Sequence, residues 1–265
     1  MRIGILFLLA IVFMSCDCYI AQPTTPTQND FLFIFWGESN SAGFADNASA
    51  TSGELSAQSQ VQIINNNTFT FQSLDIGTNN DLNNNNMYAN KHGWELELSN
   101  RVTAEPSYYG DTVWLVKTGQ NGSQVYDWRV QGADTSGGYM GKFKKRVDTA
   151  QYLLRNRNLN KVIFVSIGLN DAAYSTSVSY YATKMVENIT TIRAITKETT
   201  PIVITKFFSP FTVYNNTIDS LANVMDSVYT VDGTSATLLD TYHWDYSGMK
   251  IITNRLLTVL KTIYP

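Results

Sequence analysis

An unbroken apolar run at residues 31–36 leads directly into the turn sequence Gly37-Glu38-Ser39-Asn40. A run without polar residues predicts a strand that is buried on both faces, as in a parallel sheet. The glycine permits a tight turn where this strand ends. Open α/β sheets place their ligands at the carboxyl ends of their strands, so Ser39 is a candidate nucleophile. A serine acts in this way only if a base lies within reach, and the rest of the chain has to supply that base.

Strand and helix patterns alternate along the rest of the chain. Apolar or β-branched stretches predict further strands at 112–117, 161–167, 201–205 and 236–239, and an Asn-rich turn at 65–67 predicts a hairpin. The spacing of apolar residues predicts helices that begin near 93 and that span about 139–156, 178–196, 218–229 and 247–263. This order predicts an α/β fold, a three-layer α/β/α sandwich around a five-stranded, mainly parallel, doubly wound sheet.

Residues 1–20 have the order of a secretory signal peptide. A basic residue, Arg2, precedes an apolar stretch that is too short to span a membrane. Cys16 follows a loose match to a bacterial lipobox, so lipid attachment at Cys16 and ordinary cleavage nearby both stay open. Residues 21–29 have the composition of a linker, which leaves 30–265 as the folded domain. We expect a secreted, periplasmic, outer-membrane or cell-surface lipoprotein of a bacterium.

The composition narrows the classes of partner. A formal net charge of −3 provides no basic surface for a nucleic acid, and the weakly charged, polar character suits a neutral substrate such as a sugar. The chain has two histidines and two cysteines, and both cysteines lie in the leader, so no metal site is expected. We therefore expect a monomer that needs no cofactor and that contacts a membrane only through a lipid at Cys16.

The base must be one of the two histidines. His243 ends the sequence Asp240-Thr241-Tyr242-His243, directly after the last expected strand. A carboxylate three residues before an imidazole can bond one ring nitrogen while the other takes the serine proton. Taken alone, this motif could also be a surface histidine with a chance acidic neighbour. The serine turn after the first strand and the Asp-x-x-His motif after the last strand, taken together, favour catalysis. His92 has no such acidic residue before it and is expected to be structural.

The reaction also needs hydrogen-bond donors for an oxyanion. Asn170, in the segment 168–171 after the third strand, can offer a side-chain amide, and Gly122 can offer a backbone N–H. The backbone N–H of Ser39 would be a third donor. A helix cap at Asn170 and a plain turn at Gly122 are the alternatives. Asn121 begins a glycosylation sequon beside Gly122. A glycan there would obstruct the site, so the sequence favours a bacterial chain whose asparagines are unmodified.

These blocks, taken in order, resemble those of the SGNH hydrolases over about residues 30–265. The first block is similar to the Gly-Gln-Ser-Asn form of the sialate O-acetylesterase and acetylxylan esterase branch, but Glu38 stands in place of the usual glutamine. The segment 122–128, which ends in tryptophan, is similar to the second block of that branch. An acidic residue before the serine also occurs in the lipase-like Gly-Asp-Ser branch, so Glu38 weakens the assignment to sugar esters.

The resemblance implies a flavodoxin-like fold and a role for each matching residue. Ser39 would be the nucleophile, His243 the general base and then acid, and Asp240 the partner that orients His243. The oxyanion hole would consist of Ser39, Gly122 and Asn170. Contacts to substrate are expected from four further residues near the blocks, of which the tryptophans either stack on a sugar or cap the core: Glu38, Asn40, Trp128 and Trp244.

The expected function is a secreted serine esterase that removes acetyl or other short acyl groups from carbohydrates through an acyl-enzyme. One alternative is a lipase or lysophospholipase on the same fold. Another is a carbohydrate-binding protein without catalysis, although a pure binder has no physical need for Ser39, Asp240 and His243 together.

Overall fold

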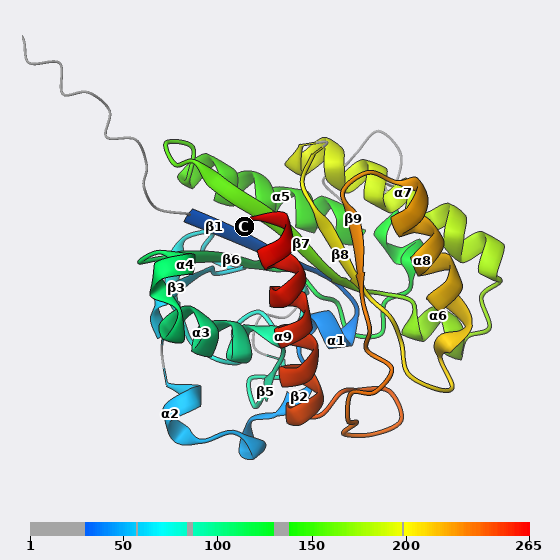
Figure 1. The fold of residues 1–265 in the computed structure, drawn as a ribbon, viewed down its shortest axis with the longest axis horizontal. Coiled ribbons are helices and arrows are strands. Elements are labelled where there is room, and N and C mark those ends of the chain that lie inside the picture. Colours follow the sequence, from blue (N-terminus) through cyan, green and yellow to red (C-terminus); the bar gives the residue numbers. More distant parts are fainter. Residues whose placement is uncertain (1–29, 57, 84–86, 130–137, 198) are drawn as a thin grey trace, which may run out of the picture.

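The computed structural model describes residues 30–56, 58–83, 87–129, 138–197 and 199–265. Within these residues, seven strands form one sheet in the order β4-β3-β6-β1-β7-β8-β9, and only the β3–β4 pair is antiparallel (Figure 1). The strands are β1 (Asp30–Gly37), β3 (Gln58–Ile64), β4 (Phe71–Leu74), β6 (Val113–Lys117), β7 (Leu159–Ser166), β8 (Ile202–Thr205) and β9 (Val228–Val231). A small second sheet pairs β2 (Ala45–Asp46) with β5 (Lys91–His92).

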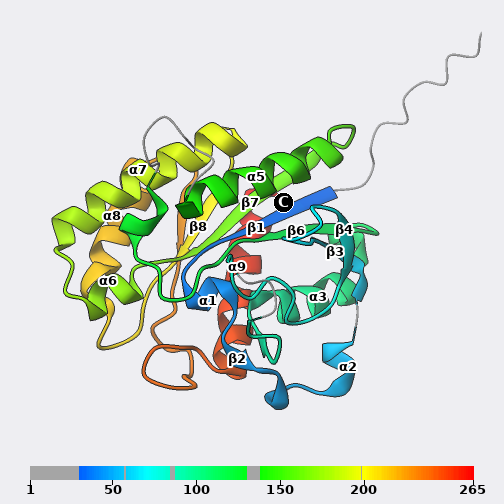
Figure 2. The same ribbon diagram turned by 180° about the vertical axis from the view of Figure 1, so that it is seen from behind.

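Helices cover both faces of the large sheet. The helices α3 (Trp94–Ala104) and α9 (Tyr246–Ile263) pack together on one face, while α5 (Gly138–Leu153), α7 (Val178–Thr196) and α8 (Asn215–Val224) lie on the other (Figures 1 and 2). The short helices are α1 (Ser39–Ala42), α2 (Ser52–Leu55), α4 (Pro106–Tyr109), α6 (Leu169–Ala173), η1 (Asn47–Ser49), η2 (Val125–Trp128) and η3 (Thr212–Tyr214). Among the helices of the described ranges, none combines the length and the apolar character needed to cross a membrane.

Strand β1 lies in the middle of the sheet. It pairs in parallel with β6 on one side and with β7 on the other, so that Phe33 stands opposite Leu115 and Val162. Its six apolar residues, 31–36, are all 0% exposed. Two helical layers remove both faces of the strand from water, which explains why no polar residue interrupts the run.

The structure confirms the α/β/α sandwich with a mainly parallel, doubly wound sheet, but the expected number of five strands is wrong. The hairpin strands β3 and β4 join the sheet at its edge. The last parallel strand is β9, whose first two residues were predicted as the end of the helix 218–229. The described residues 236–239, which were predicted as the last strand, do not form one. There, Leu238 forms a single antiparallel bridge with Trp244, which closes the loop that holds Asp240 and His243.

The turn after β1 is tied to the end of β7. Gly37 has a φ of +138°, and a Cβ placed on it would lie 1.9 Å from the backbone oxygen of Ser166. That same oxygen accepts a hydrogen bond from the backbone N–H of Glu38, at 2.8 Å. Only glycine allows this close approach, which brings Ser39 to the carboxyl edge of the sheet.

We expect Gly37→Ala to destabilise the protein by about 3 kcal/mol or more, because the new methyl group meets backbone and the left-handed φ disfavours a side chain. Denaturant unfolding of the variant and the parent measures the change. Gly53→Ala in α2 is the matched control, since a Cβ there meets no atom within 4 Å. Its free energy of unfolding should stay the same or rise slightly. Equal stability of both variants would contradict the role of Gly37.

Candidate active site

A continuous chain of hydrogen bonds links Ser39, His243 and Asp240. The Ser39 Oγ lies 3.0 Å from the Nε2 of His243. On the other side of the ring, Nδ1 lies 3.0 Å and 2.9 Å from the two carboxylate oxygens of Asp240. This is the order in which a serine nucleophile, a base and an orienting carboxylate have to stand, although Ser39 and His243 are 204 residues apart.

Asp240 is fixed by its own loop. Its Oδ1 accepts hydrogen bonds from the backbone N–H groups of Tyr242, at 2.7 Å, and His243, at 2.9 Å. Partial burial raises the pKa of this carboxyl, but the hydrogen bonds from the His243 ring and from these N–H groups outweigh that effect and lower it. Asp240 is therefore an anion at neutral pH, suited to stabilise an imidazolium.

An aromatic ring holds the imidazole from its flank. Phe44, just beyond α1, stacks on the His243 ring with the centroids 4.0 Å apart and an angle of 21° between the planes. Stacking and the bonds to Asp240 together restrict the rotation of His243, which leaves Nε2 directed at Ser39.

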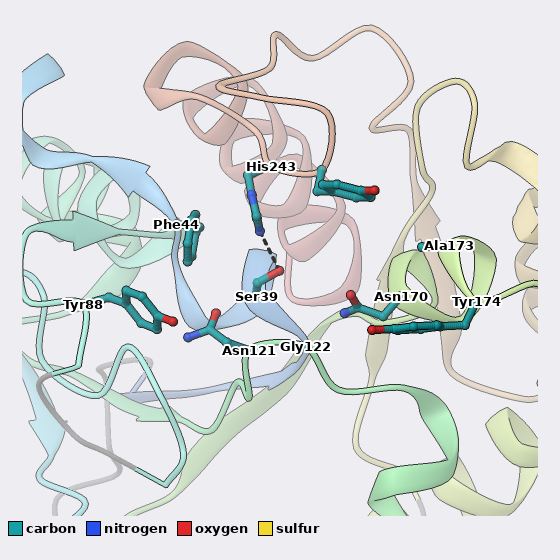
Figure 3. A pocket seen from close by; sticks show the side chains of 10 residues that line it. Ser39, Phe44, Tyr88, Asn121, Gly122, Asn170, Ala173, Tyr174 and His243 are labelled. Atoms are coloured by element: carbon teal, nitrogen blue, oxygen red, sulfur yellow. Dashed lines mark hydrogen bonds between the residues drawn. The ribbon is translucent and has the colours of Figure 1, made fainter.

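Ser39 and His243 open into a cavity of about 470 Å³. Figure 3 shows Phe44 and Tyr88 on one side of this cavity, and Asn170 with Tyr174 on the other. The cavity is lined by Ser39, Phe44, Tyr88, Asn121, Gly122, Asn170, Ala173, Tyr174, Tyr242 and His243. Three of these side chains are tyrosines, which combine a ring face with a hydroxyl group.

The three residues expected to supply oxyanion donors line this cavity. Ser39 is the first residue of α1, where the backbone N–H has no acceptor within the helix. Gly122 has a φ of +72° and faces open space, since a Cβ placed on it would meet no atom within 4 Å. The Asn170 Nδ2 donates to the backbone oxygen of Ser123, at 3.0 Å, and to Oε2 of Glu38, at 3.2 Å. An oxyanion would therefore have to share the amide of Asn170 with these two acceptors.

The four residues expected to contact substrate do not reach the cavity, and that expectation is wrong. Their side chains are all 0% exposed, and each makes contacts inside the protein: Glu38, Asn40, Trp128 and Trp244. The Nε1 of Trp128 donates to Ser123 Oγ, and the Trp244 ring packs edge-on against Phe208. The alternative that both tryptophans cap the core is the one observed.

Asn40 braces the histidine loop instead of binding substrate. Its Nδ2 donates to the backbone oxygen of Tyr242 at 3.1 Å, and its Oδ1 accepts from the backbone N–H of Trp244 at 3.2 Å. These two bonds flank His243 on both sides. Asn40, the residue after Ser39, thus ties α1 to the loop that carries His243.

His92 makes no hydrogen bond to Ser39, Asp240 or His243 and does not line the cavity beside them. It is 0% exposed, its Nδ1 lies 3.0 Å from Asn47 Oδ1, and burial is the main reason why its pKa falls to about 4. This neutral, buried ring fits the structural role that the sequence predicts. Within the described residues, no group of three or more His, Cys, Asp and Glu side chains is arranged to hold a metal ion.

The aromatic side chains that line the cavity were not predicted from the sequence. Tyr242 stands inside the Asp-x-x-His motif, Tyr174 follows the third block, and Phe44 follows the first. Their proximity to the blocks is the signal that was available. Tyr88 lies in an Asn-rich loop whose approach to the site no local pattern reveals.

We expect Asn40→Ala to lower kcat by roughly tenfold or more with little change in KM, because the His243 loop loses both of its bonds to α1. Steady-state kinetics on an acetyl ester gives the two constants, and thermal unfolding gives the stability, which should fall by about 1–3 kcal/mol. Asn216→Ala, at an exposed position on α8, is the matched control and should leave both unchanged. A normal kcat in Asn40→Ala would rule out the brace.

Comparisons with known proteins bear on the family. The family model described as carbohydrate esterase, sialic acid-specific acetylesterase, matches residues 29–261. A solved structure of a protein from Arabidopsis thaliana is similar with a TM-score of 0.66 and 16% identity, covering 89% of this chain and 100% of that one. A carbohydrate acetylesterase from Xanthomonas citri is similar with a TM-score of 0.58 and 11% identity, covering 88% of this chain and 56% of its own.

A comparison with curated protein sequences found no match. At these identities, the two solved structures support the fold alone. The family match, by contrast, spans most of the chain and includes all the blocks that resemble SGNH hydrolases, and it agrees with the branch that the first block indicates. The chain belongs to the family of carbohydrate esterases described as sialic acid-specific acetylesterases, and it is a carboxylic ester hydrolase.

Proposed function

We propose that this esterase removes acetyl or similarly short acyl groups from a carbohydrate through a Ser39-His243-Asp240 triad and a covalent acyl-enzyme. The observation that carries the proposal is the hydrogen-bonded chain from Ser39 Oγ through the His243 ring to Asp240. The family description supports a carbohydrate ester as the substrate class.

In the acylation step, Ser39 Oγ attacks the ester carbonyl and its proton passes to Nε2 of His243. The oxyanion of the tetrahedral intermediate takes hydrogen bonds from the N–H groups of Ser39 and Gly122 and from the Asn170 amide. Collapse of the intermediate breaks the bond to the sugar oxygen, which leaves as an alcohol with the proton from His243. Asp240 stabilises the imidazolium throughout.

In the deacylation step, a water molecule replaces the sugar alcohol. His243 takes a proton from this water, and the resulting attack on the acyl carbon forms a second tetrahedral intermediate. Its collapse releases the carboxylic acid and returns the proton to Ser39. The tyrosine rings of the cavity wall support binding of the sugar, because such rings stack on its C–H faces while their hydroxyls bond its oxygens.

We expect Ser39→Ala and His243→Ala each to lower kcat/KM on p-nitrophenyl acetate by about a thousandfold or more while the protein stays folded. Ser220→Ala, at an exposed serine on α8, is the control and should keep full activity. Circular dichroism and thermal unfolding verify the fold of each variant. Wild-type rates in both triad variants would remove the mechanism.

A panel of substrates separates the proposed activity from its alternatives. The wild-type protein is incubated with acetylated xylan, acetylated sialosides and long-chain esters, and the released acid is measured. Release of acetate from a glycan supports the proposal, whereas a preference for long chains would favour a lipase. Glycan binding without any hydrolysis would favour a binding protein.

Export and anchoring are part of the same proposal, and residues 1–29 lie outside the described residues. In a bacterial host fed with radiolabelled palmitate, we expect the label on the wild-type chain and none on Cys16→Ser. A chain that is exported without the label would indicate ordinary signal cleavage instead of a lipid anchor.

A further inference from the structure

Glu38 directly precedes the proposed nucleophile Ser39 and forms hydrogen bonds with the proposed oxyanion donor Asn170. It is 0% exposed, and it lies between the end of β1 and the start of α1. Its Oε2 accepts hydrogen bonds from the backbone N–H groups of Leu169, at 3.1 Å, and Asn170, at 3.3 Å, and from the Asn170 Nδ2, at 3.2 Å. One carboxyl oxygen therefore holds both the backbone and the side chain of Asn170.

The second carboxyl oxygen has a different partner. Oε1 lies 3.4 Å from Ser166 Oγ, a hydroxyl that can either donate or accept. The groups within hydrogen-bond distance of the Glu38 carboxyl are neutral N–H and O–H groups, and the backbone N–H of Gly168 acts on it as well, so none of these partners is a cation. A proton on Oε1 would complete the set, with Oε2 accepting three bonds and Oε1 donating to Ser166.

The balance of forces favours that proton. Burial raises the pKa of Glu38 to about 8, the N–H donors of Asn170 and Leu169 lower it by less, and the nearby charge of Asp171 raises it further. At pH 7 the carboxyl is therefore mainly neutral. A neutral carboxyl has the shape of a carboxamide and the same pairing of one acceptor with one donor.

We propose that Glu38 is a positioning residue that works as a neutral carboxylic acid, holding Asn170 in place while leaving its amide available to the oxyanion. This inference rests on the proposed function and names what sets the strength of the oxyanion hole. The neutral acid is the weaker acceptor, so Asn170 Nδ2 can share its hydrogens with a developing negative charge.

Ionisation of Glu38 would oppose catalysis in two ways. The carboxylate would bind Asn170 Nδ2 more strongly and compete with the oxyanion for it, because hydrogen bonds to a charged acceptor are about twice as strong as neutral ones. It would also place a negative charge one side chain away from the site where the oxyanion forms, in surroundings that screen charge poorly. Both effects lower the rate as the pH rises.

Other titratable groups face this region from the elements around it. Asp171 lies on α6, with a pKa raised to about 6 mainly by burial, and Asp127 on η2 adds to that shift. Tyr181 comes from α7 and stays neutral because burial raises its pKa well above the usual value. His243 lies 3.0 Å from Ser39 Oγ. The Asn170 amide donates to Glu38 and to a backbone oxygen, and to none of these other titratable groups.

The test compares pH profiles of kcat/KM for the wild type and Glu38→Gln on an acetyl ester, with spontaneous hydrolysis subtracted. We expect the wild-type value to fall as the pH rises through about 8 and to level off at the lower rate of the ionised form, because the protonated fraction falls. Glu38→Gln keeps a neutral group of the same shape but has no proton to lose, so its profile should lack this alkaline limb. Glu38→Ala should lower kcat at every pH with little change in KM.

Asp171→Asn provides a control with the opposite sign. Without the charge of Asp171, the pKa of Glu38 falls, so the alkaline limb of the wild-type profile should move to lower pH.

Thermal unfolding gives a readout apart from activity. The native state keeps the Glu38 proton between the ordinary pKa of 4.5 and about 8, so its contribution to stability is lost as the pH rises through this window. The Tm of Glu38→Gln relative to the wild type should therefore rise with pH.

The outcomes separate the two proposals. Profiles of the wild type and Glu38→Gln that coincide above pH 7, with the wild type active and Ser39→Ala inactive, would overturn the role of Glu38 alone. Equal rates in the wild type and Ser39→Ala would overturn the proposed function itself. A Glu38→Gln variant as slow as Glu38→Ala would show that Asn170 needs the carboxylate rather than a neutral group.

Discussion

The site depends on one backbone oxygen at the end of β7, which holds the turn that follows β1. The backbone oxygen of Ser166, the last residue of β7, accepts from the Glu38 N–H and from Ser41 Oγ, and it lies where a side chain on Gly37 would stand. The turn after β1 is thereby fixed against β7, and α1 and α6 begin side by side. Ser39 lies at the start of α1 and Asn170 near the start of α6. The two residues come close together because the strands that precede them, β1 and β7, are neighbours in the sheet.

Two carboxyl groups near Ser39 have opposite properties because their surroundings differ. The side chain of Asp240 is 45% exposed and bonded to an imidazole, and it is held as an anion. Glu38 is fully buried among neutral donors and keeps its proton at neutral pH. Solvent exposure and the kind of partner thus set the charge of each group. In the proposed mechanism the Asp240 anion stabilises the imidazolium, and the neutral Glu38 holds Asn170.

Much of the fold and the triad follow from local patterns. The apolar run of β1, the spacing of α7 and the Asp-x-x-His motif each carry their signal within a few residues. The missed strand β9 is four residues long and follows a helix closely, so no period develops that would separate the two. The burial of Asn40 and Trp244 depends on a bond between α1 and a loop 204 residues away, which no local pattern contains.

Glu38 stands where the related esterase branch has glutamine, and its position in the chain explains why this exchange is tolerated. A residue between a buried strand and its nucleophile cannot reach water, so its side chain must find all of its partners in the protein. In this chain those partners are three N–H groups on one oxygen, one hydroxyl on the other and the nearby N–H of Gly168, all of them neutral, so a protonated carboxyl can stand where a carboxamide would. Glutamate in place of glutamine therefore keeps Asn170 in its place in the proposed oxyanion hole, and the property it adds is a proton that can leave.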